Sequence, residues 1–348
     1  MTARRALYFG LIVAVTACRE TVTEVRDVIR TDTLLVTDTV VRSDTIRPTR
    51  IWYRPVLVAE GHGGISGQLT GITSDSVGIL IAEQRGSIER LDGRQVFDLS
   101  PYLPKPATYF GGLFNILYHA GRLFAFYSTT DSLAVISEVL RDGSVRPLLR
   151  SAKYRVQHYG GGLAAQGDYL YVALGDGQHF QGEGETTGLY GRLLRLDLRT
   201  GAMDTIAKGL RSPWRIALQN DSIWIADTGA FLWEEVNRVS VNDRRVHLGW
   251  PHMEGNFCRV DDCSSYQRPV YTYPTAAFGC SAIIGGYVWR GRYWFTDFCE
   301  AWFRSIGEDG VRHEFDLAGE VTGFGLVGED LYVIGFQQGR VWKVEEVR

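Results

Sequence analysis

One short pattern recurs along most of this chain and limits what the chain can fold into. A turn followed by an apolar, β-branched or aromatic run appears six times, and a related run follows most copies. The first runs are Gly78–Ala82, Arg122–Phe126, Tyr169–Ala173, Ser222–Ala226, Arg292–Thr296 and Asp330–Ile334. The second runs are Ser87–Leu91, Arg192–Leu196, Glu235–Val239, Trp302–Ile306 and Arg340–Val344. Such runs, bracketed by turn residues, are typical of short antiparallel strands.

The spacing of these copies predicts an all-β chain folded as a six-bladed β-propeller. The copies start roughly 40 to 70 residues apart, which is the range of propeller blades with loop insertions. Radial closure protects the strand edges, and we expect the opening strand, Ile51–Ala59, to complete the last blade. A β-sandwich is the alternative, but it does not explain the repeat. The longest gap, Val241–Tyr287, is interpreted as a large insertion.

The N-terminus has the features of an export signal. Arg4 and Arg5 precede an apolar run, Ala6–Ala17, which is too short for a stable membrane span. The small residues before Cys18 are similar to the lipobox of bacterial lipoproteins, and this resemblance implies lipidation of Cys18. The alternatives are an ordinary signal peptide or an N-terminal anchor with an incidental cysteine. We therefore expect residues 1–18 to be a signal peptide, and the protein to be exported and lipid-anchored at the cell envelope.

Residues 19–50 differ from the rest of the chain because they contain neither glycine nor an aromatic residue. A six-residue repeat, VIRTDT, LLVTDT and VVRSDT, occupies positions 28–45. Its pattern fits neither a helix face nor a regular strand. We interpret the segment as an extended, solvated tether, with a self-pairing β-type stalk as the alternative. The propeller domain then comprises residues 51–348.

The cysteine count points to disulfide bonds. Of the five cysteines, four remain after Cys18 is set aside, and an even number in an exported protein favours disulfides. Four cysteines allow three connectivities, of which we favour Cys258–Cys263, a tight loop, and Cys280–Cys299, which joins two adjoining segments. A zinc site is the alternative. The lack of a CxxC pair and the exported context argue against it.

Charge and motif content exclude some classes of function. The net charge of -3 provides no basic surface for nucleic acid. No GxSxG motif and no His, Asp or Glu cluster with metal-ligand spacing is present, so a hydrolase is a weak hypothesis. The polar residues best suited to chemistry instead lie in glycine-rich turns between strands, within the stretch Gln157–Asp197.

Several of these stretches resemble the glucose/sorbosone dehydrogenase family, whose members are six-bladed propellers and include soluble quinoprotein sugar dehydrogenases. The resemblance is ordered and spreads over most of residues 51–348. It includes Gly111–Leu113 with His119, His158–Gly161, Leu174–Gly177, Gly191–Asp197, Gly209–Arg215, Ile223–Gly229, Trp233–Asn237, Leu248–Pro251 with Glu254, Cys280, Gly285–Gly291 and Tyr293–Cys299. Each piece is weak alone, but their order favours the family.

The resemblance implies roles for three residues in the oxidation of a sugar or polyol. His158 corresponds to the general base that takes the hydroxyl proton, a task suited to imidazole. Asp176 corresponds to the neighbour that orients the ring. Arg211 corresponds to the cation beside the quinone oxygens, where negative charge develops. The structural alternatives are a turn histidine, an aspartate that caps its own turn, and an ordinary ion pair.

The resemblance also implies two cofactors, pyrroloquinoline quinone (PQQ) and calcium. The backbone carbonyls of Gly229 and Ala230, near Glu234, fall where the family binds calcium, which prefers oxygen ligands. Arg290 falls where a family lysine meets the carboxylates of the quinone, and its structural alternative is an ion pair at the surface or between blades. The resemblance implies a small sugar or polyol substrate and leaves the electron acceptor unknown.

The chain also departs from the pattern of the catalytic members. Ser212 and Thr228 occupy cofactor-binding positions where those members carry asparagine and glutamine. Phe110 replaces a glutamine near the substrate, Glu234 replaces an aspartate, and Glu300–Trp302 replaces Ser-Gly-Arg. Removing a buried hydrogen bond from a site can cost about 1–3 kcal/mol. Some relatives keep the propeller without redox chemistry, so a non-catalytic propeller that binds a carbohydrate or a protein is the second hypothesis.

The enzyme hypothesis makes one prediction about the fold. If it is correct, His158, Asp176, Arg211 and Arg290 converge on one face of the propeller around a flat pocket.

Overall fold

The structure is a computed structural model that describes residues 24–27, 37–40, 51–63, 67–105, 111–155, 157–179, 189–275 and 280–347. The chain divides into two compact units, Met1–Ile51 and Trp52–Arg348. In the first unit, β1 (Glu24–Asp27) and β2 (Thr37–Val40) form an antiparallel pair. Cys18 and most of the predicted tether lie outside the described residues. Among the described residues, no helix is long and apolar enough to cross a membrane.

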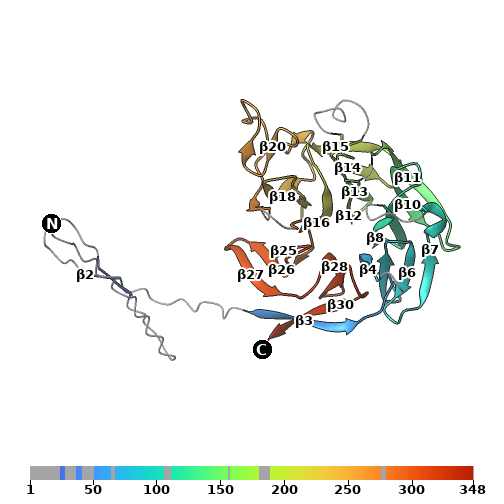
Figure 1. Cartoon of the computed structure of the whole chain (residues 1–348), viewed down its shortest axis with the longest axis horizontal. Helices are drawn as coiled ribbons and strands as arrows, with labels where there is room; N and C mark the ends of the chain where they lie inside the picture. The colour runs from blue at the N-terminus through green and yellow to red at the C-terminus, as the bar shows by residue number, and fades with distance from the viewer. Residues whose placement is uncertain are drawn as a thin grey trace, which may run out of the picture. The chain divides into compact units, whose positions relative to one another are not determined.

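The predicted all-β six-bladed propeller is confirmed, with six sheets arranged in a ring (Figure 1). Blade 1 contains β4 (Leu69–Ser74), β5 (Ile79–Glu83), β6 (Ser87–Arg90) and β7 (Gln95–Asp98). Blade 2 contains β8 (Leu113–His119), β9 (Arg122–Ser128), β10 (Leu133–Val139) and β11 (Val145–Lys153). Blade 3 contains β12 (Gly160–Gln166), β13 (Tyr169–Leu174), β14 (Arg192–Asp197) and β15 (Met203–Lys208), which β19 (Val246–His247) extends.

The other three blades follow the same plan. Blade 4 contains β16 (Pro213–Gln219), β17 (Ser222–Asp227), β18 (Trp233–Ser240) and β22 (Tyr271–Pro274). Blade 5 contains β23 (Ile283–Ile284), β24 (Val288–Trp289), β25 (Arg292–Asp297), β26 (Trp302–Gly307) and β27 (Gly310–Asp316). Blade 6 contains β28 (Val321–Val327), β29 (Asp330–Gly335), β30 (Val341–Val347) and β3 (Trp52–Ala59). The one helical segment among the described residues is the short 3-10 helix η1 (Ser100–Tyr102).

The ring closes as predicted, because β3 from the start of the domain pairs antiparallel with β30 from its end. The predicted first runs are the second strands of the blades, and the predicted second runs are the third strands. The interval Val241–Tyr287 is not an insertion throughout. It includes blade strands β22 and β23 in addition to a small hairpin of β20 (Met253–Glu254) and β21 (Phe257–Cys258).

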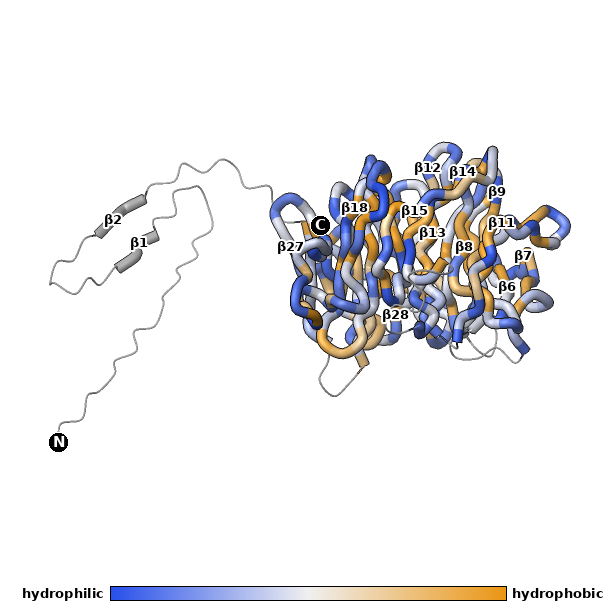
Figure 2. Tube along the Cα trace, turned by 90° about the horizontal axis from the view of Figure 1, so that it is seen from above, coloured by the Kyte–Doolittle hydropathy of each residue, from blue (hydrophilic) through white to orange (hydrophobic). Residues whose placement is uncertain are grey.

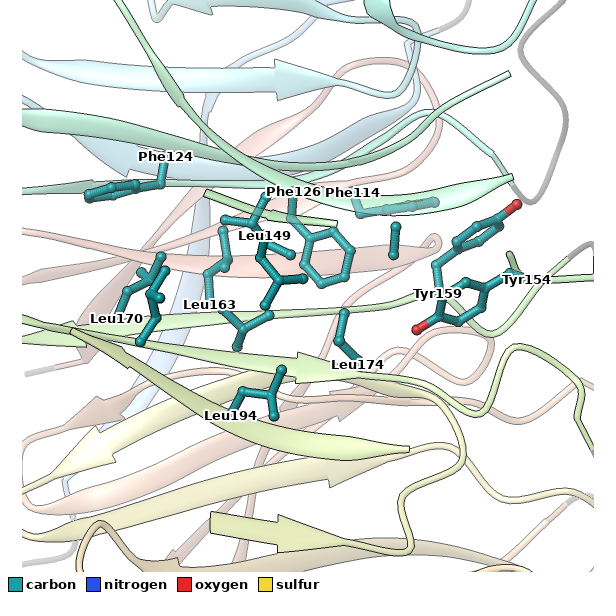
Figure 3. Close-up of a cluster of buried hydrophobic side chains, with 14 residues drawn as sticks. Phe114, Phe124, Phe126, Leu149, Tyr154, Tyr159, Leu163, Leu170, Leu174 and Leu194 are labelled. Atoms are coloured by element: carbon teal, nitrogen blue, oxygen red, sulfur yellow. The ribbon is translucent and has the colours of Figure 1, made fainter. Parts of the chain in front are cut away.

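Apolar side chains fill the space between neighbouring blades. Between blades 2 and 3, residues of β8 and β9 pack against residues of β12 and β13, with Phe124 and Phe126 fully buried (Figure 3). Apolar residues concentrate along strands such as β8 and β13, and hydrophilic residues concentrate in the loops (Figure 2). Truncating Phe126 to alanine would cost about 3–5 kcal/mol, as for other buried aromatic residues.

Both favoured disulfides are present, Cys258–Cys263 with Cα atoms 5.8 Å apart and Cys280–Cys299 with Cα atoms 5.6 Å apart. The first closes the loop after the β20–β21 hairpin, and the second joins the segment before β23 to the turn after β25. Disulfides persist in oxidising compartments, so the pair indicates a location outside the cytoplasm.

Candidate active site

His158 lies in the turn before β12 and is held by a buried aspartate. Its backbone φ of 60° is uncommon for a residue other than glycine. His158 Nδ1 lies 2.8 Å from Asp176 Oδ1, and Trp250 Nε1 donates to Asp176 Oδ2 at 2.8 Å. Because Asp176 is a carboxylate acceptor, these partners assign the proton to Nδ1 and leave Nε2 as the acceptor atom of the ring.

The glycines around Asp176 are required by close packing against the histidine turn. A Cβ added at Gly175 would collide with the carbonyl oxygen of His158, and one added at Gly177 would collide with the ring of Tyr154. The backbone N–H of Gly177 also donates to the His158 carbonyl at 3.2 Å. The sequence Gly-Asp-Gly therefore allows the aspartate turn to lie directly under the histidine.

Arg211 brings a cation to the other nitrogen of the imidazole. Its Nη2 lies 3.2 Å from His158 Nε2, and its Nη1 donates to the carbonyls of Thr228 (2.9 Å) and Gly229 (2.6 Å). Burial lowers the pKa of Arg211, and nearby acids, chiefly Asp176, oppose this shift. The guanidinium therefore lies between the base and the loop that carries the predicted calcium ligands.

Asp227 fixes the segment that carries Arg211 and Ser212. Its two carboxylate oxygens accept the backbone N–H groups of Arg211 at 2.8 Å and Ser212 at 2.6 Å. Burial raises the pKa of Asp227 to about 7, and the two N–H donors oppose that rise. Thr228 is attached to the same segment through its own N–H, which donates to the Ser212 carbonyl at 3.2 Å.

The predicted calcium loop is organised by two buried glutamates. Glu234 Oε2 accepts the N–H groups of Gly229 at 3.3 Å and Ile283 at 2.9 Å, while its buried Oε1 has no hydrogen-bond partner among the described residues. Burial raises the pKa of Glu234 to about 8. Glu254 Oε1 accepts N–H groups from four consecutive residues, beginning with Ala230 at 2.7 Å.

A cavity of about 250 Å³ opens beside His158 and Arg211. Its described lining comes from all six blades and contains no acidic residue: Thr70, Gln84, Phe114, Gln157, His158, Tyr159, Gly160, Arg211, Ser212, Trp214, Thr228, Ala282, Ile284, Phe298, Thr322 and Phe336. Phe114 and Tyr159 stack with ring centres 5.3 Å apart, and Phe298 and Phe336 meet edge to face at 5.5 Å. Such aromatic walls suit a flat, conjugated ligand.

The structure brings most of the predicted residues together but leaves one apart. His158, Arg211, Ser212 and Thr228 line the cavity, and Asp176 supports the histidine from behind. Arg290 does not line it. The Arg290 side chain is 45% exposed, pairs with Glu346 of β30 and lies over the Trp289 ring. Phe110 lies outside the described residues, and Trp302 of blade 5 is buried against Tyr273 of blade 4.

Two residues of the site had no predicted role. Trp250 binds Asp176, and Arg215 donates hydrogen bonds to carbonyls of residues that line the cavity. Both lie within stretches that resemble the family, Leu248–Pro251 and Gly209–Arg215. The resemblance marked these stretches, but no feature of the sequence showed that the two side chains reach the site.

The chain matches no family model and no curated protein sequence. Solved structures with the same fold include the PQQ-bound aldose sugar dehydrogenase of Streptomyces coelicolor, at 16% identity and a TM-score of 0.67, covering 86% of this chain and 99% of that one. A putative oxidoreductase (glucose dehydrogenase) of Thermus thermophilus matches at 20% identity and a TM-score of 0.68, covering 84% and 100%. The apo aldose sugar dehydrogenase of Escherichia coli matches at 16% identity and a TM-score of 0.68, and the match covers 84% of this chain and 99% of that one. At these identities the fold is what the proteins share.

Proposed function

We propose that this protein oxidises a hydroxyl group of a sugar or polyol, with PQQ in the cavity and His158 as general base. The observation that carries the proposal is the chain of contacts Trp250–Asp176–His158, which fixes the imidazole so that Nε2 is its acceptor atom beside the cavity. A base fixed in one tautomer by a buried carboxylate is well placed for proton abstraction.

The cavity fits an aromatic, anionic quinone. Aromatic side chains of five blades line it, and Arg211 provides a guanidinium next to the base. When bound, PQQ supplies a two-electron acceptor for the carbon that is oxidised. Phe114, Tyr159 and Trp214 would hold its rings on one side of the cavity.

The residues of the chain would then accept the proton and stabilise the charges that develop. His158 Nε2 takes the hydroxyl proton, and Asp176 stabilises the imidazolium that results. With a ligand in the cavity, Arg211 would donate its N–H groups to ligand oxygens that gain negative charge, which would leave Nε2 to accept the hydroxyl proton. A quinone held there would supply the acceptor for the C–H hydrogen and its two electrons.

In this structure hydrogen-bond donors of the protein contact two of the oxygens that the resemblance assigns to calcium, whereas the buried Glu234 Oε1 has no hydrogen-bond partner among the described residues. The Gly229 carbonyl already accepts a hydrogen bond from Arg211, and Glu234 Oε2 already accepts two backbone N–H groups. Among the described residues, no group of three or more His, Cys, Asp or Glu side chains is placed to hold a metal. The proposed function therefore includes no calcium step.

The test is a titration of the purified protein with PQQ, followed by cofactor absorbance, and then dye reduction with a panel of aldoses and polyols. We expect saturable binding and turnover. We expect His158→Ala to lower turnover by about 10²- to 10⁴-fold, the usual contribution of a general base. His313→Ala is the matched control, because His313 is 53% exposed on β27. Unchanged turnover in His158→Ala would refute the role of the base.

A non-catalytic propeller that binds a carbohydrate or protein at the cell envelope is the second candidate. It is favoured by one observation, the pairing of Arg290 with Glu346, which removes an expected cofactor ligand from the cavity. Failure of PQQ to bind the folded protein at high concentration would favour this candidate over the dehydrogenase.

A further inference from the structure

Arg215 lies on β16, the innermost strand of blade 4, and its side chain is 5% exposed. The guanidinium donates hydrogen bonds to three backbone carbonyls from three blades. These belong to Trp214 at 2.8 Å, to Phe114 at 3.1 Å, and to Thr70. One side chain thus joins blades 4, 2 and 1.

The same side chain also lies against the other three blades. A Cβ added at Gly161 of blade 3 would lie 3.1 Å from Arg215 Nη1, and one at Gly323 of blade 6 would lie 3.4 Å from Nη2. At Gly285, before β24 of blade 5, an added Cβ would lie 3.0 Å from the Arg215 Cβ. Contact with all six blades places Arg215 at the centre of the ring.

Arg215 has no acidic partner in the described part of the chain, whereas Arg90, Arg122 and Arg292 each form an ion pair with a carboxylate. Burial is the sole cause that lowers the pKa of Arg215, and at about 9 the group stays charged at neutral pH. The three carbonyls accept hydrogen bonds from its Nη1 and Nη2 groups, and its guanidinium carbon lies 4.7 Å from the centre of the Trp214 ring. Neither kind of contact cancels the unit charge of Arg215, because neither partner carries a net charge.

This charge lies directly beneath the cavity. The three residues whose carbonyls bind Arg215, namely Thr70, Phe114 and Trp214, all line the cavity. None of the described lining residues is acidic. A buried cation that no carboxylate neutralises attracts anions more strongly than a surface cation, because solvent screens it less.

We propose that Arg215 is the counter-charge for a carboxylate-bearing aromatic ligand in this cavity, which makes the cavity selective for anions. The inference rests on the cavity of the proposed function but not on its redox chemistry. It gives Arg215, at the floor, the electrostatic role that the resemblance assigned to Arg290. Arg215 acts through the field it creates and is a positioning residue.

The test uses two fluorescent dyes of the same shape, the anionic 1-anilino-8-naphthalenesulfonate and the uncharged N-phenyl-1-naphthylamine. Their binding is measured on the full chain and on Arg215→Gln, which keeps a hydrogen-bond donor but loses the charge. We expect Arg215→Gln to weaken the anionic dye about tenfold or more and to leave the neutral dye within about twofold. Ala282→Trp, which fills the cavity, defines the background, and Arg290→Met is the matched control with no expected effect.

A second variant keeps the test valid if Arg215→Gln does not fold. In Arg211→Gln the cavity lining loses its guanidinium, so any remaining preference for the anionic dye must come from Arg215. Persistence of that preference supports the proposal, and equal binding of the two dyes overturns it.

Titration with PQQ and with its uncharged trimethyl ester separates this inference from the proposed function. If neither form binds but the dye preference depends on Arg215, the proposed function fails and the inference stands. If PQQ binds and turns over equally well in Arg215→Gln, the inference fails and the proposed function stands.

Discussion

Arg211, two residues before β16, and Arg215, near the start of β16, are four residues apart, yet they lie in opposite electrostatic surroundings. Three buried acids, Asp176, Asp227 and Glu234, surround the guanidinium of Arg211. The guanidinium of Arg215 contacts three carbonyls and the Trp214 ring, and it has no acidic partner among the described residues. Arg211 lines the cavity and can exchange its partners for those of a ligand, whereas Arg215 is enclosed by six blades. One arginine is therefore suited to chemistry and the other to a fixed field.

The largest expected difference between the two arginines is in stability. Arg215→Met leaves three buried carbonyls without donors, and each such loss costs about 1–3 kcal/mol, so we expect a loss of at least about 3 kcal/mol. Arg211→Met should cost less than half as much, because Arg211 is only partly buried and Thr228, one of its two carbonyl partners, lines the cavity. Denaturant unfolding of both variants measures this. Equal losses would contradict the comparison.

The second difference is in turnover with PQQ. Arg211→Met removes a donor to developing charge, so we expect kcat to fall about 10²-fold. Arg215→Lys keeps the central charge, so it should change kcat by less than a few-fold and should largely retain the affinity for PQQ. Steady-state rates at saturating cofactor separate the two effects. A large loss of kcat in Arg215→Lys would show that both arginines act in the chemical step.

The third prediction concerns pH, because the surroundings of Arg211 contain titratable acids. Burial raises the pKa of Glu234 from 4.5 to about 8. Between these values the folded protein holds a proton that the unfolded chain has lost, so stability falls as pH rises, by at most about 1.4 kcal/mol per pH unit. Glu234→Gln should match the wild type near pH 5 and exceed its melting temperature at pH 8. Parallel pH profiles for the two proteins would argue against a buried, titrating Glu234.

The smallest expected effect is that of calcium. Because Arg211 occupies the Gly229 carbonyl, neither added calcium nor a chelator should change the melting temperature or the affinity for PQQ. Thermal unfolding with and without calcium checks this directly. A saturable stabilisation by calcium would mean that Arg211 leaves the carbonyl for the metal, and the comparison of the two arginines would then need revision.

Much of the fold could be predicted from the sequence because the second and third strands of the blades are rich in β-branched and aromatic residues. The innermost strands were not among the predicted runs. β12 begins with three glycines, and β28 contains two. Their Cβ positions are filled by neighbouring blades: a Cβ at Gly162 would lie 2.9 Å from Ile216. Because the innermost strands converge around the centre of the ring, they need small residues such as glycine. These strands therefore lack the β-branched and aromatic residues by which a strand is usually predicted from a sequence.

The candidate site could be predicted in part. The resemblance identified His158, Asp176 and Arg211, which meet within hydrogen-bonding distance. It could not show that Arg290 pairs with Glu346, because that contact depends on how β30 packs beside β24. Arg215 was missed for a related reason. The proposed electrostatic role of Arg215 depends on the absence of an acidic side chain around it in the described structure. The spacing of residues in the sequence does not reveal which side chains the six blades bring together at the centre of the ring.

Closure of blade 6 by β3 has a consequence for the order of assembly. Synthesis delivers β3 before every other strand of the propeller, but its partner β30 ends only at Val347. The ring therefore cannot close until β30 has been synthesised. The surroundings of Arg215 are likewise incomplete until β28, which carries Gly323, has been synthesised and has packed against it. Any ligand that needs the finished cavity must bind after that point, and a premature stop that removes β30 leaves five complete blades, the strand pair β28–β29 and an open edge.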